Sequence, residues 1–332
     1  MPKYKIIVNP IAGRGAGEQA IPRIERMLSE YGLDFDLVRT ERPWHAADLA
    51  QEAVAAGYDA VVALGGDGTS NEVLNGLMRA KITHIPGPSD LSPALPYEGR
   101  EREGRKTCAM GVLCVGTGND FAYGAGIPTD LEAGCWVLAQ GHRRTIDVGR
   151  VAGGLYPQGR YFGNGIGIGF DAVVGFEAAK MRWLRGFLCY LVAVLKTVFL
   201  YYKAPLTTIE YDGQTITQSS LLISVMNGRR MGGGFMMAPE SKPDDGLFDL
   251  CIAREVSRAR IFGLIPHFIQ GTQATQEPIR TGRARRVVVT AMEGVLPAHA
   301  DGETLCTEGR RLELELLPRQ IEVICQPPEA AQ

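Results

Sequence analysis

Three glycine-rich or acidic runs contain the residues of this sequence that are best placed to do chemistry. The first, GGDGTSNE, spans residues 65–72 and follows an apolar run, 59–64, that predicts a short strand. Asp67 places a carboxylate among glycines, which let a ligand approach the backbone closely. Thr69 and Glu72 have the spacing of a capping box, so we expect a helix to begin at Thr69. A helix start, a glycine turn and a carboxylate together suit a phosphate group with a metal ion.

The other two runs are GTGNDFA at 116–122 and DGE at 301–303. The first follows a second strand-like run, 110–115, and the second lies between two strand-like runs late in the chain. Asparagine and aspartate before a helix most often cap it, and a DGE turn is common on protein surfaces. Residue types alone therefore leave both runs open to a purely structural interpretation.

The elements that must position these runs are strands and helices in alternation. Strands are predicted at 4–8, 35–38 and 59–64, with helices near 18–31 and 45–56 between them. This order predicts a Rossmann-like parallel sheet wound with helices. Ligands of such sheets bind at the carboxyl ends of the strands, where the loops 9–17, 39–45 and 65–70 meet.

The sequence pattern changes after residue 147, where strand-like runs separated by glycines dominate. We expect an antiparallel, β-sandwich-like domain at 148–319 with a helical insert at 175–203. The α/β domain would then span 1–147, and residues 320–332 could return to it. The fold class expected is α/β plus β. Its later strands are predicted at 161–164, 209–211, 221–225, 248–252, 287–290, 312–316 and 321–325.

Six motifs occur in the order found in the diacylglycerol kinase catalytic-domain family, which the whole chain resembles. They are NPIAG at 9–13, GGDGTSNE, GTGNDFA, FGNGIGIGFDA at 162–172, the DDG turn at 244–246 and DGE. The resemblance is strongest to soluble bacterial diacylglycerol kinases, and it extends to sphingosine kinases and NAD kinases. It implies a kinase that transfers the γ-phosphoryl group of ATP to a lipid hydroxyl with Mg²⁺, with diacylglycerol as the expected acceptor.

The resemblance also implies roles for individual residues. Glu303, oriented by Asp301, is interpreted as the general base, with Asp67 as a rival for that role. A structural magnesium ion is expected on the Asp245 carboxylate and the main-chain oxygens of Lys242 and Leu247. The expected nucleotide-binding residues are Asn9, Pro10, Ala12, Gly13, Arg14, Thr40, Gly65, Gly66, Asp67, Gly68, Thr69, Glu72, Thr117, Asn119 and Asp120.

Composition and charge limit the possible partners and cellular compartment of the protein. The net charge of −2 gives no basic field for nucleic acid. The seven cysteines form no CxxC pair, which indicates free thiols in a reducing, cytoplasmic compartment. An NAD kinase, a sphingoid-base kinase and a non-catalytic nucleotide- or lipid-binding protein remain alternatives. The acceptor lipid and the oligomeric state stay open, and a homodimer is a possible assembly.

Two further segments carry expectations. The proline-rich run 83–106 is interpreted as an exposed insertion. Residues 183–202 are apolar almost all round, so a helix there must be buried or contact lipid. A core helix and a membrane span are alternatives; we favour a helix that lines an acyl-chain pocket. Basic residues at its start would then face lipid headgroups at a membrane surface, namely Lys180, Arg182 and Arg185.

Overall fold

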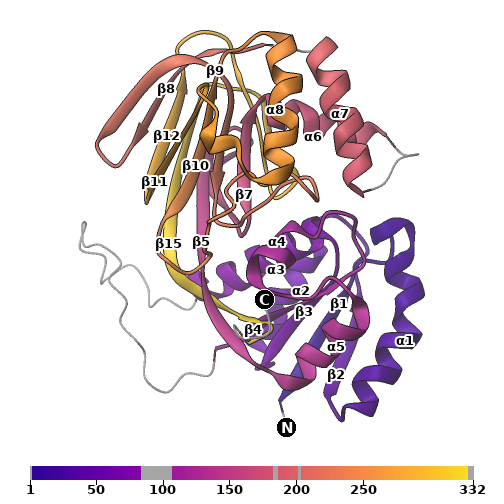
Figure 1. Cartoon of the computed structure of the whole chain (residues 1–332). Helices are drawn as coiled ribbons and strands as arrows, with labels where there is room; N and C mark the ends of the chain where they lie inside the picture. Colours follow the sequence, from indigo (N-terminus) through magenta and orange to yellow (C-terminus); the bar gives the residue numbers. More distant parts are fainter. Residues whose placement is uncertain (1, 84–106, 182–185, 201–202, 328–332) are drawn as a thin grey trace, which may run out of the picture.

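The structure is a computed structural model that describes the chain except residues 1, 84–106, 182–185, 201–202 and 328–332 (Figure 1). Its N-terminal domain is built on parallel strands in the spatial order β4-β3-β1-β2. Residues of β3 and β4 are buried throughout, which is typical of a parallel sheet with both faces covered. The strands are β1 (Lys3–Val8), β2 (Asp34–Arg39), β3 (Ala60–Gly65) and β4 (Ala109–Cys114).

Helices cover both faces of this sheet because neighbouring strand residues point to opposite sides. Ile6 packs in a cluster with α1 (Ala16–Glu30) and α5 (Leu131–Gln140). Ile7 packs on the other face, where α2 (His45–Ala55), α3 (Asp67–Thr83) and α4 (Asp120–Ala125) lie. The turns that follow β1, β3 and β4 therefore share one edge of the sheet.

The C-terminal domain is a sandwich of two largely antiparallel layers. One layer contains β5 (Arg143–Gly153), β6 (Tyr156–Phe162), β8 (Leu206–Tyr211), β12 (Arg286–Ala291) and β15 (Arg311–Ile324). The other contains β7 (Gly165–Gly169), β9 (Gln214–Met226), β10 (Phe248–Arg254), β11 (Ile279–Ala284), β13 (Leu296–Ala300) and β14 (Glu303–Gly309). Strand β9 pairs with both β8 and β7 and so passes from one layer to the other.

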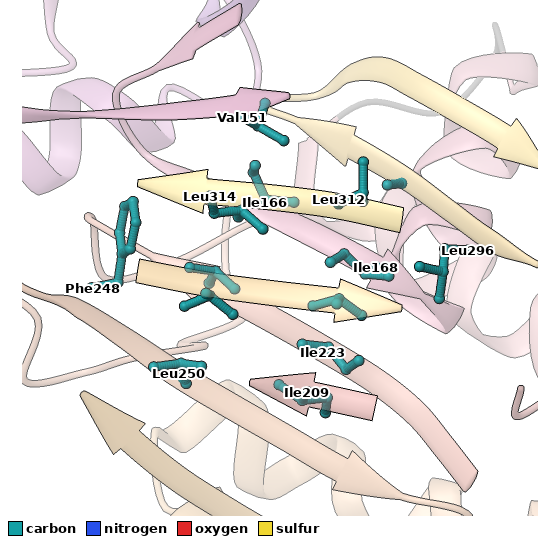
Figure 2. Packing of buried hydrophobic residues seen from close by; sticks show 14 of the residues in the cluster. Val151, Ile166, Ile168, Ile209, Ile223, Phe248, Leu250, Leu296, Leu312 and Leu314 are labelled. Atoms are coloured by element: carbon teal, nitrogen blue, oxygen red, sulfur yellow. The ribbon is translucent and has the colours of Figure 1, made fainter. Parts of the chain in front are cut away.

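Apolar side chains from both layers fill the space between them (Figure 2). Phe162 of one layer stacks on Phe248 of the other, with ring centroids 5.5 Å apart. The predicted fold class, α/β plus β, is confirmed.

A layer of helices covers the outer face of the second sheet (Figure 1). It consists of α6 (Phe170–Lys180), α7 (Gly186–Leu200) and α8 (Arg258–Gln270). Leu222 and Ala253 face these helices, whereas their neighbours Ile223 and Ile252 face the sandwich interior. Because β9 and β10 are buried on both faces, their sequences are apolar at consecutive positions rather than at alternate ones.

Strands β5 and β15 connect the two domains. They pair antiparallel over most of their length, and Val323, near the end of β15, pairs in parallel with Met110 of β4. The runs 312–316 and 321–325, expected as two strands, belong to this one long strand, with an irregularity between Leu317 and Ile321. The end of the described chain therefore lies beside the N-terminal sheet.

Other expectations need correction. Helix α3 begins at Asp67, so Thr69 is inside the helix and is not its N-cap. The glycines of the FGNGIGIGFDA motif at 165–169 form strand β7, which was not among the predicted strands. Helix α8 and strand β11 were not anticipated. The proposed insertion lies outside the described residues from 84 onward. Among the described helices, none is long and apolar enough to cross a membrane.

Candidate active site

The turn between β3 and α3 is built by close backbone packing. A Cβ on Gly65 would lie 2.3 Å from the Thr69 hydroxyl oxygen, and one on Gly66 would lie 3.2 Å from the Cα of Gly116. Glycine is therefore required where the turn packs on Thr69 and on the loop after β4. Asp67 follows directly at the start of α3, where the helix presents free N–H groups.

Thr69 and Glu72 fix neighbouring loops instead of capping their own helix. The Thr69 hydroxyl accepts a hydrogen bond from Asn9 Nδ2 at 3.1 Å. The Glu72 carboxylate accepts one from the backbone N–H of Ala46, at the start of α2, also at 3.1 Å. Burial raises the pKa of Glu72. The capping-box prediction is therefore wrong, because Thr69 and Glu72 bind residues of other loops and do not cap α3.

The loop after β1 lies against the loop after β4. Gly13 has φ +58°, and a Cβ there would come within 2.2 Å of the Val115 carbonyl oxygen. Only glycine fits this conformation and this distance. Asn9, Ala12, Gly13 and Arg14 all line the central cavity.

Asp67 and Asp120 form a close carboxylate pair next to Gly118. A Cβ on Gly118 would lie 2.8 Å from Asp67 Oδ2 and 3.5 Å from Asp120 Oδ2. Asp67 also accepts a hydrogen bond from the Phe121 N–H at 3.1 Å. Burial, followed by the charge of Asp67, raises the pKa of Asp120 to about 7. Burial likewise raises the pKa of Asp67.

Arg230, which the sequence analysis did not single out, connects Asp120 to the second domain. Its Nε lies 3.0 Å from Asp120 Oδ1, and its Nη2 donates to the Gly118 carbonyl at 3.2 Å. The guanidinium also stacks on Tyr123, 3.9 Å from the ring centroid. The backbone N–H of Gly233 donates to both Asp120 oxygens at 3.1 Å. No local sequence signal identifies Arg230, because its partners lie more than a hundred residues away in the chain.

Asp301 is a buried anchor at the turn between β13 and β14. Its Oδ1 accepts hydrogen bonds from the N–H groups of Asn164 and Gly165 at 3.0 and 2.9 Å. Its Oδ2 accepts from Asn71 Nδ2 and the Gly163 N–H, both at 2.8 Å. Four donors therefore hold both oxygens, and Asn71 of α3 ties this turn to the N-terminal domain.

Glu303 begins β14 and reaches Gly68, in the first turn of α3, across the domain boundary. A Cβ on Gly68 would lie 2.9 Å from Glu303 Oε1. The side chain is exposed at the rim of the central cavity. The structure thus brings Glu303, Asp67 and Asp120 together around Gly68 and Gly118.

One continuous cavity of about 560 Å³ joins the two halves of the molecule. Its polar half is formed by the three N-terminal loops together with Asp301 and Glu303. Its apolar half runs between the second sheet and the helices α6, α7 and α8, and includes Val174, Val194, Leu222, Leu264 and Phe268.

The remaining predicted residues divide between lining and supporting positions. Thr117 lines the cavity. Pro10, Thr40, Gly65 and Asn119 are not among the described residues that line it. Thr40 extends the pairing of β2 with a hydrogen bond to the Val8 carbonyl at 2.8 Å, and Asn119 Nδ2 donates to Gly116 at 3.1 Å.

The Asp245 carboxylate, in the turn predicted to bind magnesium, already has partners within the protein. Asp245 Oδ2 is paired with the guanidinium of Arg283, and its Oδ1 accepts a hydrogen bond from the Leu247 N–H at 3.2 Å. No cluster of three or more metal-ligating side chains is found among the described residues, here or elsewhere. Because Arg283 already pairs with the Asp245 carboxylate, the residues present do not fit a cation there. The magnesium site at Lys242, Asp245 and Leu247 stays a prediction.

Profiles of two protein families match this chain. The diacylglycerol kinase catalytic domain matches residues 3–151, and the YegS C-terminal NAD kinase beta sandwich-like domain matches residues 164–325. Over residues 3–151 the chain is therefore similar to the diacylglycerol kinase catalytic-domain family. The predicted resemblance is therefore confirmed.

Two bacterial relatives align with nearly the whole chain. A diacylglycerol kinase of Mycobacterium tuberculosis is 28% identical over 97% of this chain and 94% of its own length. One of Bacillus subtilis is 29% identical over 91% of this chain and 90% of its own length.

Solved structures agree on the fold. A diacylglycerol kinase from Bacillus anthracis superposes with a TM-score of 0.70 at 21% identity, covering 98% of this chain and 97% of its own. A yeast NADH kinase superposes with a TM-score of 0.51 at 10% identity, covering 98% of this chain and 84% of its own.

Proposed function

We propose that this protein is an ATP-dependent lipid kinase and that diacylglycerol is an acceptor, giving phosphatidic acid. The observation that carries the proposal is the single cavity, whose polar half suits a triphosphate and whose apolar half suits an acyl chain. The names of the relatives from Mycobacterium tuberculosis and Bacillus subtilis agree with this acceptor.

The N-terminal loops would hold the nucleotide. The start of α3 and the glycine turn before it offer N–H groups to phosphate oxygens, and Arg14 adds a positive charge at the cavity wall. Asp67 would hold a divalent cation directly or through water, because its carboxylate lines the cavity beside the glycine turn, whereas Asp120 is already paired with Arg230. Mg²⁺ held there would neutralise charge on the phosphate oxygens of ATP.

The acceptor hydroxyl would meet the phosphate beside Gly68. A carboxylate takes the hydroxyl proton, the lipid oxygen forms its bond to the γ-phosphorus, and the bond between that phosphorus and the bridging β–γ oxygen breaks to release ADP. We assign the base role to Glu303, because it approaches the turn from the lipid side and has an exposed carboxylate. Asp67 remains the rival base. Asp301 would position the strand turn that carries Glu303.

The apolar half of the cavity favours a lipid over NAD as acceptor. NAD has no long apolar chain, whereas this half is lined by aliphatic and aromatic side chains from three helices. The cavity does not by itself distinguish diacylglycerol from a sphingoid base. The retained carboxylates favour a catalyst over a non-catalytic binding protein.

Helix α7 supports a peripheral encounter with the membrane. Leu188, Leu195 and Phe199 are 55%, 38% and 67% exposed and share one face of the helix. Tyr190 and Val194, on the opposite side, line the cavity. The helix therefore places an exposed apolar face and a cavity wall back to back. A homodimer also remains a proposal, which sedimentation would test.

The deciding experiment offers the purified protein labelled ATP, Mg²⁺ and either diacylglycerol vesicles or NAD. We expect labelled phosphatidic acid, identified by mass spectrometry, and no labelled NADP. Label in NADP but not in lipid would make it an NAD kinase. Binding of nucleotide and lipid with no ADP formed would make it a binding protein.

A further inference from the structure

A polar pair interrupts the apolar half of the cavity. Asp171, in the first turn of α6, and His299, in β13, face each other with Nε2 and Oδ2 3.7 Å apart. Their side chains are 19% and 10% exposed, and both residues line the cavity. That separation is too long for a direct hydrogen bond.

The pair also has hydrogen-bonding capacity that the described protein leaves unused. Asp171 Oδ2 and His299 Nδ1 are buried and have no partner in the described part of the chain. A buried polar atom without a partner destabilises the protein, so in native structures such atoms usually bind a water molecule or a ligand. A ligand between the two side chains is placed to satisfy Asp171 Oδ2.

The backbone makes room for the pair. His299 lies opposite Gly167 of β7 in the strand register. A Cβ on Gly167 would come within 2.2 Å of Asp171 Oδ2 and 2.6 Å of His299 Nε2. Any other residue at 167 would occupy the space where the two side chains meet.

The chemistry of the two groups selects the ligand. A carboxylate only accepts hydrogen bonds, whereas an imidazole with its proton on Nε2 donates one from that atom. An oxygen about 2.8 Å from each atom can span the 3.7 Å between them if it both donates and accepts. A hydroxyl group does so, and an amino group can donate to the carboxylate. An ester oxygen can only accept, so it leaves Asp171 unsatisfied.

We propose that Asp171 and His299 bind a free hydroxyl or amino group next to the hydroxyl that is phosphorylated. The protein then also phosphorylates single-chain lipid alcohols that carry such a group, and does so more efficiently than matched lipids without it. This inference rests on the proposed lipid kinase activity and adds an acceptor class to it. Both residues act as positioning residues for the acceptor, with the base and the phosphates unchanged.

The test compares three acceptors with the same acyl chain: a monoacylglycerol, the propanediol monoester that lacks its middle hydroxyl, and the diacylglycerol. We expect kcat/KM to be about 10-fold or more higher for the monoacylglycerol than for the propanediol monoester. Asp171→Asn and His299→Phe should each bring that ratio near one, while the KM for ATP stays unchanged.

Thr197→Val is the matched control, because this buried hydroxyl of α7 also has no partner in the described chain but does not line the cavity. It should keep the wild-type ratio. Equal kcat/KM for the two monoesters in the wild type would overturn the inference and leave the kinase proposal standing. Variants that lose activity on all three acceptors equally would assign the pair to the fold and also overturn it. No transfer to any lipid, diacylglycerol included, would overturn both proposals.

Discussion

Four of the carboxylates that line the cavity, Asp67, Asp120, Asp301 and Glu303, differ in their partners, and the partners indicate different roles. Four donors occupy both carboxylate oxygens of Asp301, so this side chain is not placed to accept a proton from a reacting group. Asp120 is paired with Arg230, and Asp67 accepts from the Phe121 N–H. Glu303 alone of the four is classed as exposed, at the rim of the cavity. The four side chains have the same chemical group, but their surroundings make Asp301 an anchor and support Glu303 as the proposed base.

Glu303→Gln should lower kcat by about 10²-fold or more with little change in the KM for ATP, because an amide cannot take the hydroxyl proton. Steady-state kinetics with diacylglycerol would measure it. Glu308→Gln, an exposed glutamate on the same strand, is the control and should leave kcat unchanged. A raised KM for ATP with an intact kcat would make Glu303 a nucleotide contact.

Asp67→Ala should abolish transfer and leave the melting temperature within a few degrees. Its side chain sits at the cavity on a glycine turn, where it serves ligands more than the core. Loss of a phosphate or metal partner costs several kcal/mol of transition-state stabilisation. Retention of about a tenth of the activity or more would show that the role is wrongly assigned; differential scanning fluorimetry gives the stability.

Asp120 should make the protein less stable as the pH rises. Its pKa is about 7 in the folded protein because of burial and the nearby Asp67 charge, against an ordinary value of 3.8. Between these values the folded state holds a proton that the unfolded state releases, so the free energy of unfolding falls as pH rises through this window. Melting temperatures measured from about pH 5 to pH 8 should decline less steeply in Asp120→Asn. Parallel declines in both proteins would contradict the assignment.

At the scale of elements, the sequence predicts strands and turns that depend on neighbouring residues, but it does not predict contacts between residues far apart in the chain. Strand β3 and the turn after it are set by neighbouring residues, and both were predicted. Glu72, however, binds Ala46 at the start of another helix, and Asp301 binds groups near residue 164. Spacing within a motif carries no information on such partners. Helix α8 was missed, although Ser257 caps its start and Gly271 ends it.

Lys196 shows how an element resolves an apparent conflict in the sequence. A buried lysine without a partner is costly in a nearly apolar helix, but the Nζ of Lys196 lies 2.5 Å from Oε2 of Glu177 on α6, whose side chain is 3% exposed. Lys180 pairs with the other Glu177 oxygen at 2.6 Å and is 63% exposed. The hydrogen bonds from Lys180 and then Lys196 lower the pKa of Glu177. The carboxylate therefore joins α6 to α7.

We expect Lys196→Met to destabilise the protein more than Lys180→Met. Lys196 is the less exposed partner at 42%, and it links two helices, whereas Lys180 lies on the same helix as Glu177. The cost of Lys196→Met should be about 1–2 kcal/mol and that of Lys180→Met below about 1 kcal/mol. Chemical denaturation would measure both. Equal losses would mean that the contact between the helices contributes nothing beyond a surface ion pair.

At the scale of the whole molecule, the architecture separates the proposed ATP site from the proposed entrance for the lipid. The parallel sheet gathers the phosphate loops at one edge, and β5 and β15 connect it to a sandwich that carries a helical layer (Figure 1). The cavity runs from that edge to the space beneath α7. A lipid that leaves a bilayer along α7 would reach the phosphates without crossing water.

The exposed face of α7 should therefore matter for lipid in membranes and not for lipid in solution. Replacing Leu188, Leu195 and Phe199 together by Gln removes an apolar stripe that is on the surface, so the fold should tolerate it. We expect weaker vesicle binding in flotation assays and about 10-fold lower turnover of vesicle-borne diacylglycerol, since burying each such side chain in lipid is worth about 1.5–3 kcal/mol. Turnover of a short-chain, monomeric acceptor should be unchanged.

Leu155→Gln and Met292→Gln, at 68% and 58% exposure away from α7, are the controls and should behave as wild type. Equal loss on both substrates in the triple variant would show that this face supports the fold or the chemistry and does not meet the membrane.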